Sequence, residues 1–138
     1  MSSDVRSEAI EFVRDHPTSH LATVEDNAPY TRIMQVFQVD DDFCIWYVSG
    51  ASSNKVRQIR KCPKVCVSIW ESGRDARVLG SAQVLTDERT RRQMWREEWK
   101  RFFPKGRDDP EYCLLKVTPE TVEYRDVNKH GFTTQKVV

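Results

Sequence analysis

The chain has 138 residues, of which 38% are hydrophobic and 31% are charged, and its formal net charge is +1. This length suits one domain, residues 1–138, with a single hydrophobic core. The near-zero net charge excludes the basic footprint of a typical nucleic-acid-binding protein. No apolar run approaches the ~20 residues that cross a bilayer, and charges interrupt the N-terminal segment. We therefore expect no signal peptide, no membrane contact and a cytoplasmic location.

Three segments have the residue pattern of amphipathic helices. They span residues 1–17, residues 52 to about 61, and residues 88–103, and Pro17, Pro63 and Pro104 mark their ends. The third segment is predicted to be one continuous helix. Its apolar stripe consists of Trp95, Trp99, Phe102 and Phe103.

Six further segments show the apolar alternation or apolar runs of β-strands. They are residues 19–25, 29–40, 43–49, 65–70, 76–85 and 113–126, the last predicted to be two short strands that meet at Thr118-Pro119. Tight turns join most neighbours and helices intervene at only three points, unlike the regular alternation of a parallel sheet. We predict a mainly β (α+β) fold, a small antiparallel barrel with flanking helices. Residues 127–138 are expected to form a loosely held C-terminal tail.

The four cysteines do not form a metal-binding pattern. Disulfides are not expected in a cytosolic chain. Cys62 and Cys66 are separated by three residues and have no histidine nearby, which differs from a zinc knuckle. We therefore predict no metal site, and we interpret Cys44, Cys66 and Cys113 as small buried apolar residues.

The segment that begins the second helix combines several groups that favour an anion. A helix N-terminus presents unpaired N–H groups and the positive end of the helix dipole. Ser52 and Ser53 add hydroxyls, Asn54 adds an amide, Lys55 adds a full charge, and Gly50 lets the backbone come close. Such a group can bind phosphate. An ordinary serine N-cap followed by a solvated lysine is the alternative explanation.

Arg32 is a second candidate for anion binding. It lies in the middle of a predicted strand and shares one face with Met34, because side chains alternate along a strand. An exposed arginine on an edge strand is the alternative. Together with Lys55 and the helix start, Arg32 would suit a dianionic phosphate. Trp95 and Trp99 are typical of a core or a subunit interface, and contact of Trp95 with a flat ring is a secondary interpretation.

The order of these features resembles the pyridoxamine 5'-phosphate oxidase-like FMN-binding split barrels, in particular the general stress protein type. The similarity covers roughly residues 5 to 126. The similar segments, in chain order, are HLATV, PYTRIM, FCIWYVSGASSNKVRQI, KCPKVCVSIW, VLGSAQVLTDERTRRQMW and FFPKGRDDPEYCLLKVTPETVEYRD. The resemblance implies a six- to seven-stranded antiparallel split β-barrel, and a homodimer that binds FMN between its subunits.

The resemblance also implies which residues contact FMN. Arg32 and Lys55 would pair with the phosphate, and Ser49 and Ser53 would donate hydrogen bonds to it, with Asn54 close by. The other implied contacts are the backbone of Ile33 and Met34 at the isoalloxazine ring, and Trp95 from the partner chain.

The expected function is therefore that of an FMN-dependent oxidoreductase acting on a small substrate, with a stress-related role as one option. The chain ends in VNKHGFTTQKVV and lacks the Arg-x-His element that pyridoxamine phosphate oxidases carry near their C-terminus. This difference argues against vitamin B6 oxidation. Two alternatives stay open. One is a flavin store or sensor without turnover, and the other is a different ligand in the same cleft, deazaflavin F420 or haem.

Overall fold

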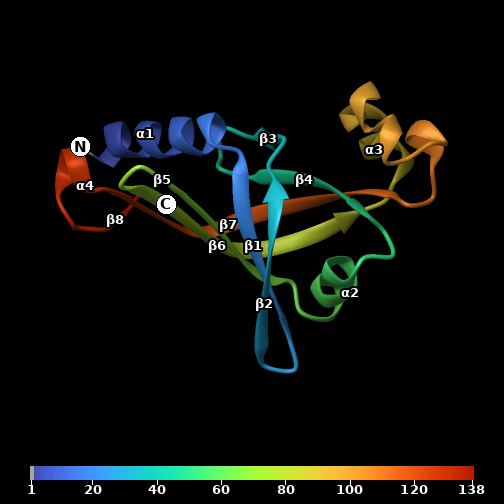
Figure 1. Ribbon diagram of the computed structural model, residues 1–138, viewed down its shortest axis with the longest axis horizontal. Helices are drawn as coiled ribbons and strands as arrows, with labels where there is room; N and C mark the ends of the chain where they lie inside the picture. Colours follow the sequence, from blue (N-terminus) through green and yellow to red (C-terminus); the bar gives the residue numbers. More distant parts are fainter. Residues whose placement is uncertain (1) are drawn as a thin grey trace.

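The computed structural model describes residues 2–138, and side chains from Val5 onward. Eight strands form one antiparallel sheet in the order β2-β1-β5-β6-β7-β4-β3, with β8 added to β7 (Figure 1). The elements are α1 (Ser2–Asp15), β1 (Thr18–Glu25), β2 (Ala28–Gln35), β3 (Gln38–Val39), β4 (Ile45–Gly50), α2 (Asn54–Lys61), β5 (Lys64–Glu71), β6 (Arg74–Leu85), α3 (Glu88–Met94), the 3-10 helices η1 (Glu97–Arg101) and η2 (Gly106–Asp108), β7 (Tyr112–Asp126), α4 (Val127–His130) and β8 (Gln135–Lys136).

The two ends of the sheet belong to one chain segment, which closes the barrel. β2 pairs with β1, and only two residues later β3 pairs with β4. At this crossing, Val36 donates its N–H to the carbonyl of Pro17 at 2.8 Å, and Phe37 donates to that of Trp46 at 3.1 Å. The segment predicted as one strand, residues 29–40, is therefore two strands. The predicted antiparallel split barrel with flanking helices is confirmed.

The barrel interior follows from the alternation of side chains along the strands. In β1, Ser19, Leu21 and Thr23 are buried, while their neighbours in the strand are more exposed. Helix α1 lies along the sheet (Figure 1) and buries the apolar face formed by Val5, Ala9, Phe12 and Val13. β4 is buried on both faces, as its apolar run predicts. Tyr47 belongs to the main core, and Trp46 belongs to a second cluster with Trp99, Phe103, Tyr112 and Leu114.

A tight turn holds the β1–β2 hairpin, which extends away from the rest of the barrel (Figure 1). Asp26 and Asn27 have φ values of 52° and 63°, and Glu25 pairs with Ala28. A two-residue turn with positive φ at both positions matches the twist of a hairpin, and Asp and Asn tolerate that conformation. The tight turn expected between the first two predicted strands is therefore formed by these two residues.

The prediction of one continuous helix over residues 88–103 is wrong. α3 ends at Met94, Trp95 adopts ψ 136°, and the chain continues as η1. This break allows Trp95 and Trp99 to pack around Tyr112 of β7, with ring centroids 5.1 and 6.0 Å away. Phe102 does not join the expected apolar stripe, because it is 60% exposed. Packing against β7 thus overrides the local helical pattern.

The two short strands predicted for residues 113–126 are also wrong, because β7 continues through Pro119. Pro119 stands opposite Gly80 of β6, where the register of the pair shifts. This irregularity accommodates a residue without an N–H donor inside the sheet. The approach is close, since a Cβ atom on Gly80 would lie 2.1 Å from the carbonyl oxygen of Thr118.

The C-terminal residues are held more firmly than the sequence indicates. Val137 donates its N–H to the carbonyl of Val122 at 2.8 Å, and β8 pairs with β7. Lys129 and His130 both contact the carboxylate of Glu8. Residues 127–138 therefore connect β7 with α1. In the part of the chain described, no helix combines the length and apolarity needed to cross a membrane.

Candidate functional site

Arg32 lies in β2 on the face that turns toward the barrel interior. The register pairs Arg32 with Leu21 and Met34 with Ser19, and Leu21 and Ser19 are both buried. Residues directly opposite each other in a β-ladder point to the same face. Arg32 and Met34 therefore share one face, and Arg32 is half-buried beside β1.

The guanidinium of Arg32 is held only by uncharged acceptors. Its Nη1 donates to Thr23 Oγ1 at 2.8 Å and to the carbonyl of Leu21 at 3.2 Å, and its Nη2 donates to Gln58 Oε1 at 2.9 Å. No carboxylate within the described residues forms an ion pair with it. Burial lowers the pKa of Arg32 because the charged form loses hydration.

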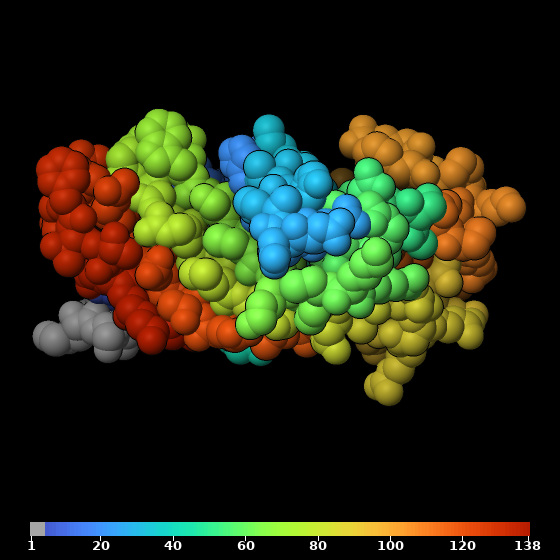
Figure 2. Space-filling view, turned by 90° about the horizontal axis from the view of Figure 1, so that it is seen from below, coloured from blue at the N-terminus to red at the C-terminus, as the bar shows by residue number. Residues whose placement is uncertain are grey.

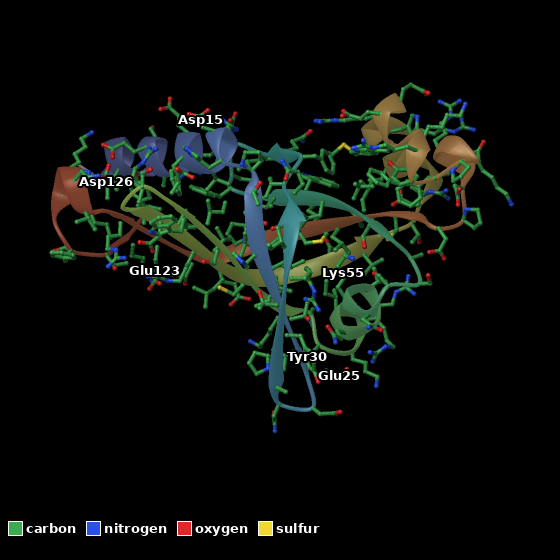
Figure 3. All side chains as sticks on the ribbon, in the orientation of Figure 1. Asp15, Glu25, Tyr30, Lys55, Glu123 and Asp126 are labelled. Atoms are coloured by element: carbon green, nitrogen blue, oxygen red, sulfur yellow. The ribbon has the colours of Figure 1, made fainter. Side chains whose placement is uncertain are left out.

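Lys55 lies in the first turn of α2, and Figure 3 shows it on the side of this helix that faces the sheet. Its ammonium makes no hydrogen bond or ion pair with any side chain that the structure describes. The pKa of Lys55 is lowered, first by burial and then by the positive charge of Arg32. Two half-buried cations from separate elements thus repel one another, and none of the acidic side chains that the structure describes pairs with them.

The start of α2 leaves donors free beside these cations. Ser53 is the N-cap, yet its hydroxyl makes no capping bond and lies 3.3 Å from the hydroxyl of buried Ser49. Within the described chain, the N–H groups of Asn54, Lys55 and Val56 have no hydrogen-bond acceptor. An N-cap hydroxyl usually accepts from one of these N–H groups, so this helix start has donors to offer a ligand.

Ser52 has a different role from the one its position in the sequence indicates. Its N–H and its hydroxyl donate to Glu111 Oε2 at 3.2 and 2.8 Å. This contact ties the loop before α2 to the residue that precedes β7. Ser52 is therefore engaged in the fold, whereas Ser49 and Ser53 remain beside the two cations.

The free edge of β2 brings Ile33 to the surface. Hydrogen-bonded and non-hydrogen-bonded pairs alternate in an antiparallel ladder, and the Val36–Pro17 bond fixes this alternation. The N–H and C=O of Ile33 consequently point away from β1, and the residue is 66% exposed. Met34 differs, because its carbonyl accepts a hydrogen bond from Ser19 at 2.8 Å. Of the two backbone groups predicted to meet a ring, only that of Ile33 lies on the free edge.

Trp95 directly follows α3, and Figure 1 shows α3 and α2 in different parts of the molecule. It packs on Trp99 and Tyr112, and its Nε1 donates to Glu97 Oε1 at 2.9 Å. A hollow of about 490 Å³ lies beside it, between η1 and η2. The structure therefore brings seven of the eight predicted site residues to α2, β2 and the strand end before α2, and leaves Trp95 in the aromatic cluster.

Sequence reasoning missed Thr23 and Gln58, both of which contact Arg32. Thr23 continues the buried alternation of Ser19 and Leu21, and Gln58 lies three residues after Lys55 on the buried face of α2. A polar residue at a core-facing position needs a hydrogen-bonding partner. The sequence pattern therefore indicates that Thr23 and Gln58 need hydrogen-bonding partners, but it does not identify Arg32 as their partner.

One cluster of potential metal ligands is engaged in hydrogen bonds within the fold. Asp40, Asp42 and Cys44 lie close together in the turn before β4. Asp40 accepts hydrogen bonds from the side chains of Trp46 at 2.8 Å and Gln38 at 2.7 Å, and Asp42 accepts from the N–H of Cys44 at 3.0 Å. Asp42 thus accepts a local turn bond, whereas Asp40 links the side chains of Gln38 and Trp46.

Comparison with known proteins gives concordant matches. The model of the family described as pyridoxamine 5'-phosphate oxidase like matches residues 4–137. General stress protein 26 of Bacillus subtilis is 26% identical over an alignment of 124 residues that covers 86% of this chain and 86% of that protein. The crystal structure of general stress protein 26 from Bacillus anthracis has a TM-score of 0.77 and 23% identity, covering 96% of this chain and 98% of that one. A related protein from Clostridium acetobutylicum, described as of the pyridoxinephosphate oxidase family, has a TM-score of 0.83 and 21% identity, covering 99% and 95%. The two structural matches show the same fold.

Proposed function

Because the chain belongs to the pyridoxamine 5'-phosphate oxidase-like family, we propose that it binds FMN and acts as a flavin-dependent oxidoreductase on a small substrate. The membership confirms the resemblance drawn from the sequence. The cofactor, the reaction and the site residues are our proposal. Oxidation of pyridoxamine phosphate is not part of it, because residues 127–138 carry no Arg-x-His element.

The observation that carries the proposal is the pair of uncompensated cations, Arg32 and Lys55. Burial and, after it, the positive charge of Arg32 lower the pKa of Lys55, and no acidic side chain among the described residues pairs with either cation. A phosphate monoester between them would relieve this repulsion with two charge-assisted contacts, each of about 1.5–3 kcal/mol. FMN ends in such a monoester. F420 carries a phosphodiester and haem carries carboxylates, which are weaker matches to a dianion site.

The remaining predicted residues fit a phosphate and the ring attached to it. The hydroxyls of Ser49 and Ser53 and the free N–H groups at the start of α2 are donors, as a phosphate requires. Exposed Asn54 lies at the same helix start, and Ile33 offers main-chain groups on the edge of β2. When bound, FMN supplies the redox chemistry, while these residues bind and orient it.

We further propose that a second copy of the chain covers the cofactor. The elements that carry Arg32 and Lys55 meet on one face of the molecule, where Figure 2 shows the β1–β2 hairpin beside α2. Ile33 and Trp70 leave large apolar side chains exposed in a single chain. Trp95, which directly follows α3, would reach the cofactor of the partner. A homodimer with FMN at the interface accounts for these observations together.

Native mass spectrometry of protein incubated with FMN tests both statements. We expect an assembly of two chains with two FMN molecules. Riboflavin, which has the same ring without the phosphate, should bind at least about a hundredfold more weakly, because it cannot use the two cations. Equal binding of riboflavin and FMN would contradict the phosphate site. Recovery of haem or F420 from purified protein would contradict the cofactor assignment.

Reduction of the bound cofactor tests the reaction. We expect NADH or NADPH, under anaerobic conditions, to bleach the visible absorption of the FMN-loaded protein, and an added acceptor to restore it. In this cycle two electrons and a proton pass from the nicotinamide to FMN and then to the acceptor. Failure with every donor, while FMN stays bound, would instead favour a flavin store or sensor. Free FMN at the same concentration is the control.

A further inference from the structure

Gln58 is a buried polar residue whose side-chain hydrogen bonds join Arg32 and Thr23, at the candidate site, to Glu25 beside it. It lies on the buried face of α2, and only 3% of it is exposed. Its Oε1 accepts from Arg32 Nη2 at 2.9 Å and from Thr23 Oγ1 at 2.5 Å, while its Nε2 donates to Glu25 Oε1 at 3.3 Å. The amide oxygen thus faces a cation and the amide nitrogen faces an anion.

This arrangement places Gln58 between the guanidinium of Arg32 and the nearby carboxylate of Glu25. Glu25 forms an ion pair with Arg57 instead. The pKa of Glu25 is lowered mainly by the hydrogen bond from Arg57 and then by that from Gln58. Figure 3 shows Glu25 near the end of the β1–β2 hairpin, on the side of α2. Arg57 therefore balances the negative charge of Glu25, and Glu25 does not form an ion pair with Arg32.

Thr23 completes the support of Arg32. Its hydroxyl accepts from Arg32 Nη1 at 2.8 Å and donates to Gln58, so both terminal nitrogens of the guanidinium, Nη1 and Nη2, donate to neutral oxygens. These contacts fix the orientation of Arg32 without cancelling its charge. A glutamate at position 58 would fit the same volume and would form a charged pair with Arg32.

We propose that Gln58 and Thr23 are positioning residues that orient Arg32 while keeping its charge available for the phosphate monoester. Gln58 spaces Arg32 from Glu25, so the ligand meets two cations rather than a neutralised ion pair. This inference rests on the proposed phosphate site. It adds that the choice of an uncharged amide at position 58 sets the preference of the site for a doubly charged ligand.

The experiment compares the dissociation constants of FMN and riboflavin, measured by quenching of flavin fluorescence at pH 7 and fixed salt. The dissociation constant of riboflavin divided by that of FMN reports the phosphate contact alone, because both ligands share the ring. We expect Gln58→Glu to reduce this ratio about tenfold to a hundredfold, with riboflavin binding unchanged within about twofold. Gln58→Met, which loses the hydrogen bonds but adds no charge, should reduce the ratio less.

Two further variants keep the test decisive. Glu25→Gln alone leaves the contacts of Arg32 in place, and the ratio should stay within about twofold of the parent. Glu25→Gln combined with Gln58→Glu keeps the net charge and avoids two adjacent carboxylates, so it serves where Gln58→Glu alone fails to fold. This double variant should lose the preference for FMN as Gln58→Glu does.

The outcomes separate this inference from the proposed function. A parent protein that binds riboflavin as tightly as FMN would overturn the phosphate site itself. A parent that prefers FMN, together with a glutamate variant that keeps the same preference, would overturn the role of Gln58 alone. An equal loss of FMN and riboflavin binding would show that Gln58 only supports the fold.

Discussion

Replacing both Arg32 and Lys55 by alanine is expected to weaken FMN binding by about 10²–10⁴-fold. Each side chain supplies one charge-assisted contact of about 1.5–3 kcal/mol to the phosphate, and a factor of ten corresponds to about 1.4 kcal/mol. The unliganded protein should lose little stability, because the substitution also removes the repulsion between two half-buried cations. Thr23 and Gln58 keep their mutual hydrogen bond in this variant.

The measurement is a fluorescence titration with FMN, accompanied by a urea unfolding curve of the protein without ligand. Arg60→Ala combined with Arg89→Ala is the matched control, since it removes the same two charges from exposed positions on α2 and α3. The control should bind FMN as the parent does. If the variant lacking Arg32 and Lys55 also retains parental affinity, the phosphate lies elsewhere.

The second large effect concerns the fold. Gly80→Ala should lower the free energy of unfolding by about 3 kcal/mol or more, because the new Cβ would lie 2.1 Å from the carbonyl oxygen of Thr118 and 2.9 Å from its carbon. The obstructing atoms belong to the backbone of β7 and cannot rotate away. To relieve the contact, the longest pair of strands in the sheet must shift at its bulge.

Gly131→Ala separates crowding from backbone conformation. Gly131 has φ +74° and ψ −160°, and no heavy atom lies within 4 Å of the position that a Cβ atom would take, so its substitution should cost about 1–3 kcal/mol through conformational strain alone. Urea midpoints of the two variants and the parent give the comparison. A Gly80→Ala protein as stable as Gly131→Ala would show that β6 and β7 separate at the bulge without loss of pairing.

The elements that the sequence predicts well are those governed by nearby residues. The alternation of Ser19, Leu21 and Thr23 and the Asp26–Asn27 turn define the first hairpin, because period-two burial and positive φ are local properties. The apolar run of β4 likewise indicates a strand covered on both faces. From such segments the antiparallel barrel follows without knowledge of the register.

The elements that the sequence predicts poorly depend on distant partners. The break at Trp95 follows from packing on Tyr112, which is remote in the chain. β7 continues through Pro119 at a bulge whose extra residue is Glu120 of β7, and Gly80 of β6, which has no Cβ atom, permits the close approach there. Neither contact can be inferred from the residues adjacent to the break or to the proline.

The candidate site likewise has one part that the sequence predicts and one part that depends on distant contacts. Arg32 and the segment from Ser49 to Lys55 stand out through their own chemistry, a cation in a strand and a polar helix start. Their proximity and the neutral support from Gln58 depend on how α2 packs against β1 and β2. The orientation of Met34, whose carbonyl faces Ser19, likewise depends on the register of the hairpin.

The unpaired edge of β2 can promote aggregation of a single chain that has no ligand bound. Thr31, Ile33 and Gln35 turn their main-chain groups away from β1, and a bare row of this kind is a template for a further strand. Pro29 blunts this edge only near the hairpin turn. A freshly synthesised chain that finds neither its ligand nor a second copy is therefore open to edge-to-edge aggregation. Under the proposed function, a bound cofactor and a second copy of the chain would cover this edge and keep the protein in solution.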